Sequence, residues 1–346
     1  MCWRVSALAP SSSVDVITPR PLVVRRGSLV IEDHELVELE LGGYAIGPEL
    51  GTAPIIVVVG GITASPFPFT GADAWWPALA ADDLVDPTCQ TVLAPCWPGN
   101  GSTWRGFEDG RLPQLSAAGL ADLIAAWLEG IGVAAPVTYL GASLGGMVGV
   151  ALAARHPERV ARLVAVSAAL RPDGWGTAVR HLQRELVHDG LRTGDIAASM
   201  VRARQLGILT YRGREELDTR FGTLAPGLDR PPVAAYLDHH GRAFAARFPV
   251  RTFLLLSEAI DRFQLRDPRA LARVAADVVV VGVPGDLVFP FELQEEMQEE
   301  LEAAGATASL WQLESAFGHD AFLADQVRLA GVLRASGCFT SVRRPR

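Results

Sequence analysis

Short apolar runs separated by turn residues recur along the first half of the chain. Residues 29–31 and 35–41 alternate apolar and acidic side chains, which predicts an antiparallel hairpin with one solvent-facing side, ended by Gly42-Gly43. Ser116 can cap a helix that continues to residue 129 with leucine and isoleucine on one face. Continuous apolar runs predict buried parallel strands at residues 55–59, 137–140, 163–166 and, more weakly, 91–94.

The pattern changes in the middle of the chain. Residues 171–246 have a helical pattern that is rich in arginine, and strand-like runs return only at 278–281 and 309–313. A helical stretch that interrupts a strand–helix series is typical of a lid inserted into a doubly wound α/β domain with a mostly parallel sheet. We therefore expect a loose segment at 1–25, a core at 26–170 and 255–340, and a helical lid subdomain at 171–254.

A serine stands between glycines where a strand-like run meets a helical one. Residues 141–146 are Gly-Ala-Ser-Leu-Gly-Gly, between the predicted strand and a small-residue helical run at 147–155. The glycines leave room for a sharp turn that exposes Ser143 at a helix N-terminus, where backbone N–H groups favour developing negative charge. This arrangement is the nucleophile elbow of the α/β-hydrolase fold, and it indicates acyl-transfer chemistry.

A serine hydroxyl needs a general base and a third group that orients the base. In this fold the order along the chain is serine, acid, histidine. The sequence offers Asp286 after the strand at 278–281 and His319 after the last strand, whereas the other histidines fall in predicted hairpin, helix-end or lid positions. Asp277 is the alternative acid, and Asp286 within Pro-Gly-Asp also suits a simple turn.

The tetrahedral intermediate of acyl transfer needs hydrogen-bond donors for its oxyanion. We expect one donor to be the backbone N–H of Leu144, which follows the nucleophile. We expect the other to be the backbone N–H of Ile62, in the loop after the strand at 55–59. The alternative for this loop is that Gly60-Gly61 only forms a turn.

Composition argues against several other classes of protein. The 346 residues carry a formal net charge of −8 and no long basic run beyond 343–346, so neither nucleic acid nor membrane is an expected partner. We find no signal peptide, membrane-spanning run, or metal, flavin or nicotinamide motif, and we expect no bound cofactor. The cysteines form no C-x-x-C pair, which favours reduced thiols in a cytoplasmic protein: Cys2, Cys89, Cys96 and Cys338.

Several segments resemble the homoserine O-acyltransferase family, often called MetX, within the α/β-hydrolase superfamily. The elbow extended to Gly-Ala-Ser-Leu-Gly-Gly-Met and the segment Gly-His-Asp-Ala-Phe-Leu at 318–323 are similar to motifs of that family. Residues 182–185 and 203–212 are similar to its lid motifs, which are more specific because lid sequences diverge fast. The resemblance covers roughly residues 50–335.

The resemblance implies a ping-pong acyltransferase that uses acyl-CoA as cosubstrate. Ser143, activated by His319 and Asp286, takes the acyl group, and the side-chain hydroxyl of homoserine then accepts it. Arg184 is implied to hold the substrate carboxylate, which a guanidinium can grip in a bidentate fork. Asp320 is implied to face the substrate ammonium.

Tyr211 is a further candidate for the substrate pocket. Each of these three assignments has a structural alternative: an exposed lid arginine for Arg184, a helix N-cap for Asp320, and a core tyrosine. The resemblance also implies a homodimer through the lid helices, although the apolar lid residues can equally belong to a core: Leu206, Ile208 and Leu209.

Two loops depart from the family pattern. Residues 95–104 only loosely resemble its Gly-Ser-Thr-Gly-Pro loop near the acyl pocket, with Asn100 in its expected place and Trp104-Arg105 where Gly-Pro is usual. Residues 64–69 are also unusual. We favour an acetyl group, and a succinyl group stays open because an arginine in this loop can pair its carboxylate. The open alternatives are a serine O-acyltransferase, a tailoring acyltransferase of secondary metabolism, an esterase that uses water, and a non-catalytic binding protein, against which the intact serine, acid and histidine set argues.

Overall fold

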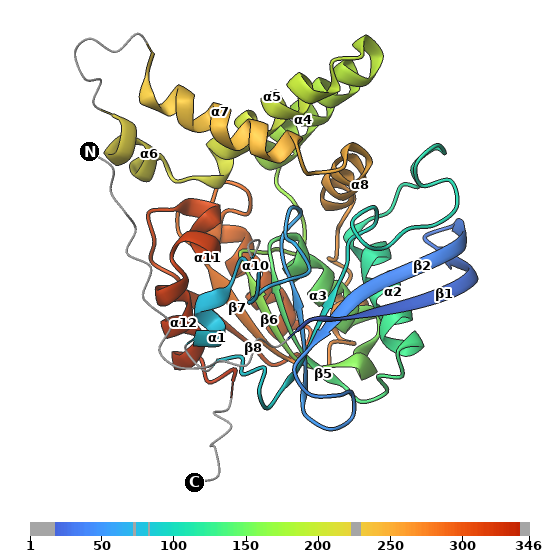
Figure 1. Cartoon of the computed structure of the whole chain (residues 1–346). Coiled ribbons are helices and arrows are strands. Elements are labelled where there is room, and N and C mark those ends of the chain that lie inside the picture. The colour runs from blue at the N-terminus through green and yellow to red at the C-terminus, as the bar shows by residue number, and fades with distance from the viewer. Residues whose placement is uncertain (1–17, 72–73, 82–83, 223–229, 340–346) are drawn as a thin grey trace.

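The computed structural model describes residues 18–71, 74–81, 84–222 and 230–339, where eight strands form one sheet between helices (Figure 1). The strand order is β1-β2-β4-β3-β5-β6-β7-β8. Strands β3 to β8 run parallel to their neighbours among themselves, whereas β2 is antiparallel to β1 and β4. The predicted fold class is confirmed. The strands are β1 (Arg20–Ile31), β2 (His34–Ile46), β3 (Ile55–Val59), β4 (Thr91–Pro95), β5 (Val137–Ala142), β6 (Val160–Val166), β7 (Asp277–Gly282) and β8 (Ala308–Gln312).

The N-terminal hairpin starts earlier than predicted. β1 begins at Arg20 and pairs with β2 along its length, so the expectation of a loose segment through residue 25 is wrong for residues 20–25. Buried or half-buried side chains of this stretch alternate with exposed ones, Val23 among them, which suits an edge strand. Residues 1–17 lie outside the described residues.

β2 also continues past the glycine pair that was expected to end it. A side chain at Gly42 would overlap the backbone of Gly101, and one at Gly43 would overlap the Trp127 ring. These glycines therefore allow a loop and a helix to approach the strand closely, which is a known role of glycine inside strands.

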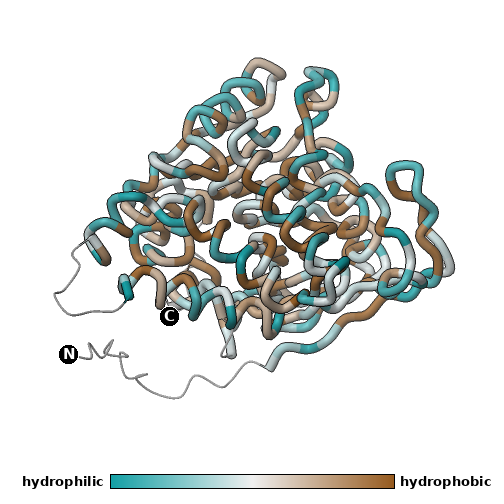
Figure 2. Tube along the Cα trace, turned by 90° about the horizontal axis from the view of Figure 1, so that it is seen from above, coloured by the Kyte–Doolittle hydropathy of each residue, from teal (hydrophilic) through white to brown (hydrophobic). Residues whose placement is uncertain are grey.

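Successive residues of the central strands face opposite sides of the sheet, and each side has its own helices. Val57 and Val59 belong to the core shared with α2, α3 and α10, whereas Ile56 and Val58 belong to the core shared with α1, α11 and α12. Figure 2 shows hydrophobic and hydrophilic stretches alternating along the helices, as expected for helices that cover a sheet. These helices are α1 (Pro77–Ala81), α2 (Ala117–Gly130), α3 (Leu144–Arg155), α9 (Pro268–Leu271), α10 (Phe291–Ala303), α11 (Ala321–Ala324) and α12 (Gln326–Ala335).

Helices α4 to α8 form a lid above the sheet (Figure 1). They are α4 (Gly174–Thr193), α5 (Ile196–Tyr211), α6 (Arg214–Phe221), α7 (Pro232–Ala245) and α8 (Val250–Asp261). The predicted lid boundary at residue 254 falls inside α8, which continues to Asp261 before the chain returns to β7. The lid has a small core of its own, built around Val187, Met200, Phe244 and Phe253.

The structure shows the burial of the lid residues considered for a dimer contact and of the cysteines. Of the apolar lid residues considered for a dimer contact, Ile208 is buried at 3% exposure, whereas Leu209 is 49% exposed. Cys96 and Cys338 are buried free thiols, Cys89 is half-buried, and Cys2 lies outside the described residues. Within the described ranges, no helix has both the length and the apolar character needed to span a membrane.

Candidate active site

The serine elbow joins β5 to α3 and holds its serine in a strained conformation. Ser143 has φ 55° and ψ −124°, a region that non-glycine residues rarely adopt. Side chains at Gly141 and Gly145 would overlap backbone atoms, of the elbow itself and of β3 respectively. The Ser143 N–H donates to the Val166 carbonyl at 2.8 Å, which ties the turn to β6. The glycines that suggested the turn are therefore required by close backbone packing.

The structure brings the serine, histidine and acid predicted from the sequence into one hydrogen-bonded chain. His319 Nε2 lies 2.9 Å from Ser143 Oγ, and His319 Nδ1 lies 2.8 Å from Asp286 Oδ2. All three residues are buried. With Nδ1–H donating to the carboxylate, Nε2 is free to accept the serine proton, and the buried acid fixes this tautomer. The arrangement can therefore generate a nucleophilic serine.

Backbone groups fix the acid in this chain. Asp286 Oδ1 accepts hydrogen bonds from Val288 N–H at 2.8 Å and Phe289 N–H at 2.9 Å, which leaves Oδ2 facing the histidine. Asp277, the alternative acid, instead pairs with Arg162 at 3.1 Å. The position of Asp277 at the first residue of β7 places it at the opposite end of that strand from the loop that carries Asp286.

Both expected oxyanion donors lie beside Ser143. Leu144 is the first residue of α3, and the first N–H groups of a helix have no partner within it. A Cβ atom at Gly61 would lie 3.7 Å from Ser143 Oγ, and the next residue, Ile62, lines the same cavity as Ser143. The Trp97 indole N–H donates to the Gly61 carbonyl at 3.1 Å and so holds this loop in place.

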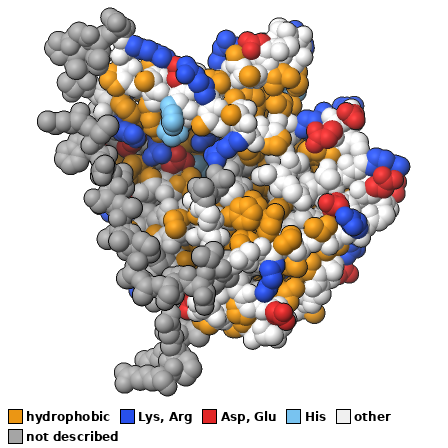
Figure 3. All heavy atoms as spheres, in the orientation of Figure 1, with side chains coloured by type: hydrophobic (Ala, Val, Ile, Leu, Met, Phe, Trp, Pro, Cys, Tyr) orange, Lys and Arg blue, Asp and Glu red, His pale blue; other side chains and the backbone are white. Residues whose placement is uncertain are grey.

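Ser143 and His319 open onto a cavity of about 210 Å³ between the core and the lid. Figure 3 shows arginine, acidic and histidine side chains together where the lid meets the core. Tyr211 lines this cavity, with its ring 6.0 Å from the His319 ring. The Arg204 guanidinium lines it too and lies 5.0 Å from the Tyr211 ring centroid and 5.4 Å from that of Phe244. The two rings hold the guanidinium by cation–π contacts.

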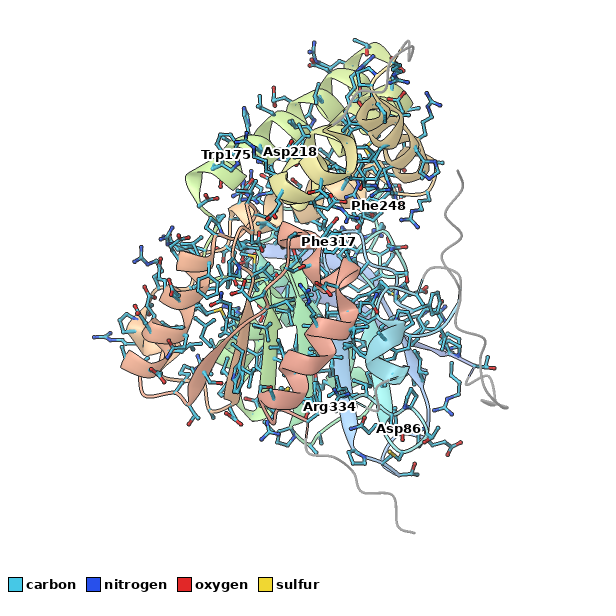
Figure 4. All side chains as sticks on the ribbon, turned by 90° about the vertical axis from the view of Figure 1, so that its left-hand side faces the viewer. Asp86, Trp175, Asp218, Phe248, Phe317 and Arg334 are labelled. Atoms are coloured by element: carbon cyan, nitrogen blue, oxygen red, sulfur yellow. The ribbon has the colours of Figure 1, made fainter. Side chains whose placement is uncertain are left out.

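Asp320 places a carboxylate at the same cavity. It forms an ion pair with Arg212 at 3.0 Å, and its side chain makes no capping hydrogen bond to the helix that follows. Arg212 in turn lies 5.7 Å from the Phe317 ring, which Figure 4 shows between the lid and the core. Burial raises the pKa of the Asp320 carboxyl, and the guanidinium groups of Arg212 and Arg204 oppose that rise.

The structure does not bring Arg184 to the cavity, so the expectation that it holds a substrate carboxylate is not supported by its position. Its Nη1 pairs with Asp261 at 2.7 Å and donates to Ser257 Oγ at 2.9 Å. The arginines that line the cavity are Arg180, Arg204 and Arg247. One sequence signal pointed to Arg204: it precedes Tyr211 by two helical turns and so shares its helix face.

The loop at residues 95–104 was expected near the acyl pocket, but it does not line the cavity. Arg105 pairs with Glu38 at 2.8 Å and is largely exposed, and none of the residues 95–105 lines the main cavity. Bridging between Glu40 and Thr103 attaches this loop to the hairpin, and on its other side Thr252 Oγ1 of α8 donates to the Pro98 carbonyl at 2.9 Å. The other unusual loop does reach the cavity, through Ala64 and Ser65. Within the described ranges, the arginines that line the cavity therefore all belong to the lid segment.

Known proteins resemble this chain over most of its length. Residues 54–199 match the family model of the alpha/beta hydrolase fold. A homoserine O-succinyltransferase of Xanthomonas campestris is 35% identical over 350 residues, covering 95% of this chain and 89% of that protein. An L-serine/homoserine O-acetyltransferase of Streptomyces lavendulae is 34% identical over 297 residues, covering 72% of this chain and 77% of that protein.

Two solved structures share the fold at low sequence identity. A homoserine O-acetyltransferase of Staphylococcus aureus has a TM-score of 0.77 at 20% identity, covering 94% of this chain and 97% of that one. An acetylester hydrolase of Corynebacterium glutamicum has a TM-score of 0.71 at 15% identity, covering 92% and 96%. The sequence relatives, rather than these folds, carry the assignment: the chain is an acyltransferase and belongs to the homoserine O-acyltransferase family of the α/β-hydrolase superfamily.

Proposed function

We propose that this protein transfers a short acyl group, acetyl or succinyl, from acyl-CoA to the side-chain hydroxyl of homoserine or serine. The observation that carries the proposal is one cavity that holds a nucleophilic serine chain, a guanidinium and a carboxylate: Ser143 with His319, Arg204 and Asp320. An amino acid carries the two opposite charges that such a guanidinium and carboxylate would bind. Relatives named for acetyl and succinyl transfer, to homoserine and to serine, support the same substrate classes.

The first half-reaction would load the serine. His319 Nε2 accepts the proton of Ser143, and Oγ attacks the thioester carbonyl carbon. The backbone N–H groups of Leu144 and Ile62 would stabilise the oxyanion, and Asp286 would stabilise the imidazolium that forms. Collapse of the intermediate breaks the C–S bond, and the histidine gives its proton to the departing sulfur. The products are CoA and an acyl-serine.

The second half-reaction would pass the acyl group to the amino acid. Arg204 is suited to the carboxylate because its guanidinium lies over two aromatic rings, and no described residue forms an ion pair with it. Asp320 is suited to the ammonium. With the acceptor held at both charges, its hydroxyl can give a proton to His319 and attack the ester carbon. The Ser143 Oγ–C bond then breaks and the histidine returns the proton to Oγ, which releases the O-acyl amino acid and regenerates Ser143.

An esterase would use the same serine chain with water as acceptor. A neutral ester has no need of a guanidinium and a carboxylate beside the histidine, so Arg204 and Asp320 favour the transferase. Structural similarity to an acetylester hydrolase at 15% identity reflects the shared fold.

A purified-enzyme assay tests the proposal. Acetyl-CoA and succinyl-CoA are each offered with homoserine, with serine and with no acceptor, and both CoA release and the O-acyl product are measured. We expect sustained CoA release only with an amino acid, and none with Ser143→Ala. Ester hydrolysis with no transfer to either amino acid would overturn the proposal in favour of an esterase.

A further inference from the structure

The cavity contains a second buried cation that the proposed chemistry does not use. Arg180 of α4 lines the cavity and is only 6% exposed. Its Nε donates to Asp261 Oδ1 at 2.7 Å, and its Nη2 has only a long contact of 3.4 Å with Thr177 Oγ1. No described residue accepts a hydrogen bond from its Nη1. Part of this guanidinium is therefore available to a ligand.

The charges around Arg180 do not balance. Asp261 is shared with Arg184, whose Nη1 lies 2.7 Å from Oδ2, and all three side chains are at most 15% exposed. Two guanidinium groups thus share one carboxylate. The other acid near this point, Asp173, caps α4 by accepting from Gly176 N–H at 2.8 Å and forms no ion pair with Arg180. A buried positive charge of this kind favours an anion in the adjoining cavity.

Arg180 lies beside the loop of the catalytic acid. A Cβ atom built at Gly176 would be 3.0 Å from Arg180 Nη1 and 3.2 Å from the Val288 carbonyl oxygen. Val288 also donates its N–H to Asp286. The guanidinium therefore lies near the loop of the catalytic acid and lines the same cavity as Ser143, and its burial separates it from bulk solvent.

The amino-acid acceptor does not account for this cation. Its carboxylate and ammonium sit on one carbon atom, so they must be bound by neighbouring groups of opposite charge. Arg204 and Asp320 are such a pair, because both line the cavity and the Arg204 guanidinium opposes the rise in the pKa of Asp320. Arg180 instead pairs with Asp261 of α8 and lies near the acid loop, so it faces a different part of the cavity.

We propose that Arg180 binds the distal carboxylate of the acyl group, so that the preferred donor is the CoA thioester of a dicarboxylic acid of the succinyl class. This inference rests on the proposed function and names its donor. The covalent step is unchanged: the C–S bond breaks, the Ser143 Oγ–C bond forms, and the serine proton passes through His319 to sulfur. The distal carboxylate stays ionised throughout. An acetyl group would leave Arg180 without its anion.

The test compares two donors on three proteins. Initial rates of CoA release are measured with succinyl-CoA and acetyl-CoA at a saturating amino acid, for wild type, Arg180→Gln and the control Arg184→Gln. Arg184 contacts the same Asp261 but does not line the cavity. Wild type should prefer succinyl-CoA. Arg180→Gln should lower kcat/KM for succinyl-CoA by about 10- to 100-fold, the loss expected for a hydrogen-bonded charge, and change acetyl-CoA by less than about threefold.

Other outcomes would overturn the inference. A wild-type preference for acetyl-CoA would do so before any variant is made. Equal losses on both donors in Arg180→Gln, as expected of Arg184→Gln, would give Arg180 a purely structural role. A rise only in the KM of the amino acid would assign Arg180 to the acceptor. Absence of transfer from either donor would instead refute the proposed function, and the inference with it.

Folding of the variants is controlled separately. Arg180→Gln leaves Asp261 its partner Arg184, so the carboxylate keeps a counter-charge. Arg180→Lys is the second variant: it keeps the charge but loses the planar fork. We expect it to recover part of the succinyl-CoA rate that Arg180→Gln loses. Failure of the lysine to recover any of that rate in a folded protein would contradict a role for the charge.

Discussion

Removing the shared carboxylate of the lid should destabilise the protein severely. Asp261 lies 2.7 Å from both Arg180 Nε and Arg184 Nη1, and its side chain is 10% exposed. Asp261→Asn keeps the shape but leaves two buried guanidinium groups without a counter-charge. Breaking a buried pair in this way costs about 3–5 kcal/mol. That is a large share of the roughly 5–15 kcal/mol that holds a typical domain folded.

The measurement is urea unfolding followed by tryptophan fluorescence, with eight tryptophans in the chain as reporters. The matched control is Glu258→Gln, which breaks the ion pair of Glu258 with Arg262 on the exposed side of α8. Exposed pairs contribute about 0–1 kcal/mol, so the control should unfold close to wild type. If Asp261→Asn lost no more free energy of unfolding than the control, water would have to solvate these guanidinium groups. In that case Arg180 would not be an unbalanced buried charge, and this argument for an anion beside it would be wrong.

Three further predictions concern the reacting centre. Asp286→Asn should lower kcat by about 10⁴-fold, because the amide no longer fixes the reactive tautomer of the histidine. Burst kinetics of CoA release measure this effect, and a loss smaller than tenfold would mean that the acid lies elsewhere. Gly145→Ala should abolish labelling of Ser143 by a serine-directed acylating probe, because the new Cβ overlaps the backbone of β3, whereas Gly174→Ala meets no atom within 4 Å and should label normally. Burial raises the pKa of Asp320, so this carboxylate loses its charge at a higher pH than an ordinary aspartate does. As the pH is lowered through that range, the KM for the amino acid should rise. Asp320→Asn should have a high KM at every pH while still forming the acyl-enzyme, and an unaltered pH profile in this variant would contradict the assignment.

Much of the fold follows from local sequence because strands and sharp turns have local signatures. The apolar run of β3 and the glycines around Ser143 predict a strand and an elbow without any knowledge of distant residues. The order of Ser143, Asp286 and His319 along the chain then indicates the hydrogen-bonded set. The hairpin was predicted less well, because Gly42-Gly43 has the composition of a turn, and only the approach of Gly101 and Trp127 explains its place in a strand.

The sequence by itself determined the fold, the nucleophile and its two partners, since each depends on residues close in the chain or on a fixed chain order. Only the tertiary structure decided which lid arginines line the cavity. Arg180 and Arg184 are one turn apart on the same helix, and Arg204 lies on the next. The choice depends on how α4, α5 and α8 pack, and on Asp261, which is 81 residues from Arg180 along the chain. When the charge and hydrogen-bond partners of a side chain are far away along the chain, the packing of the helices brings them together. Local sequence patterns do not encode such contacts.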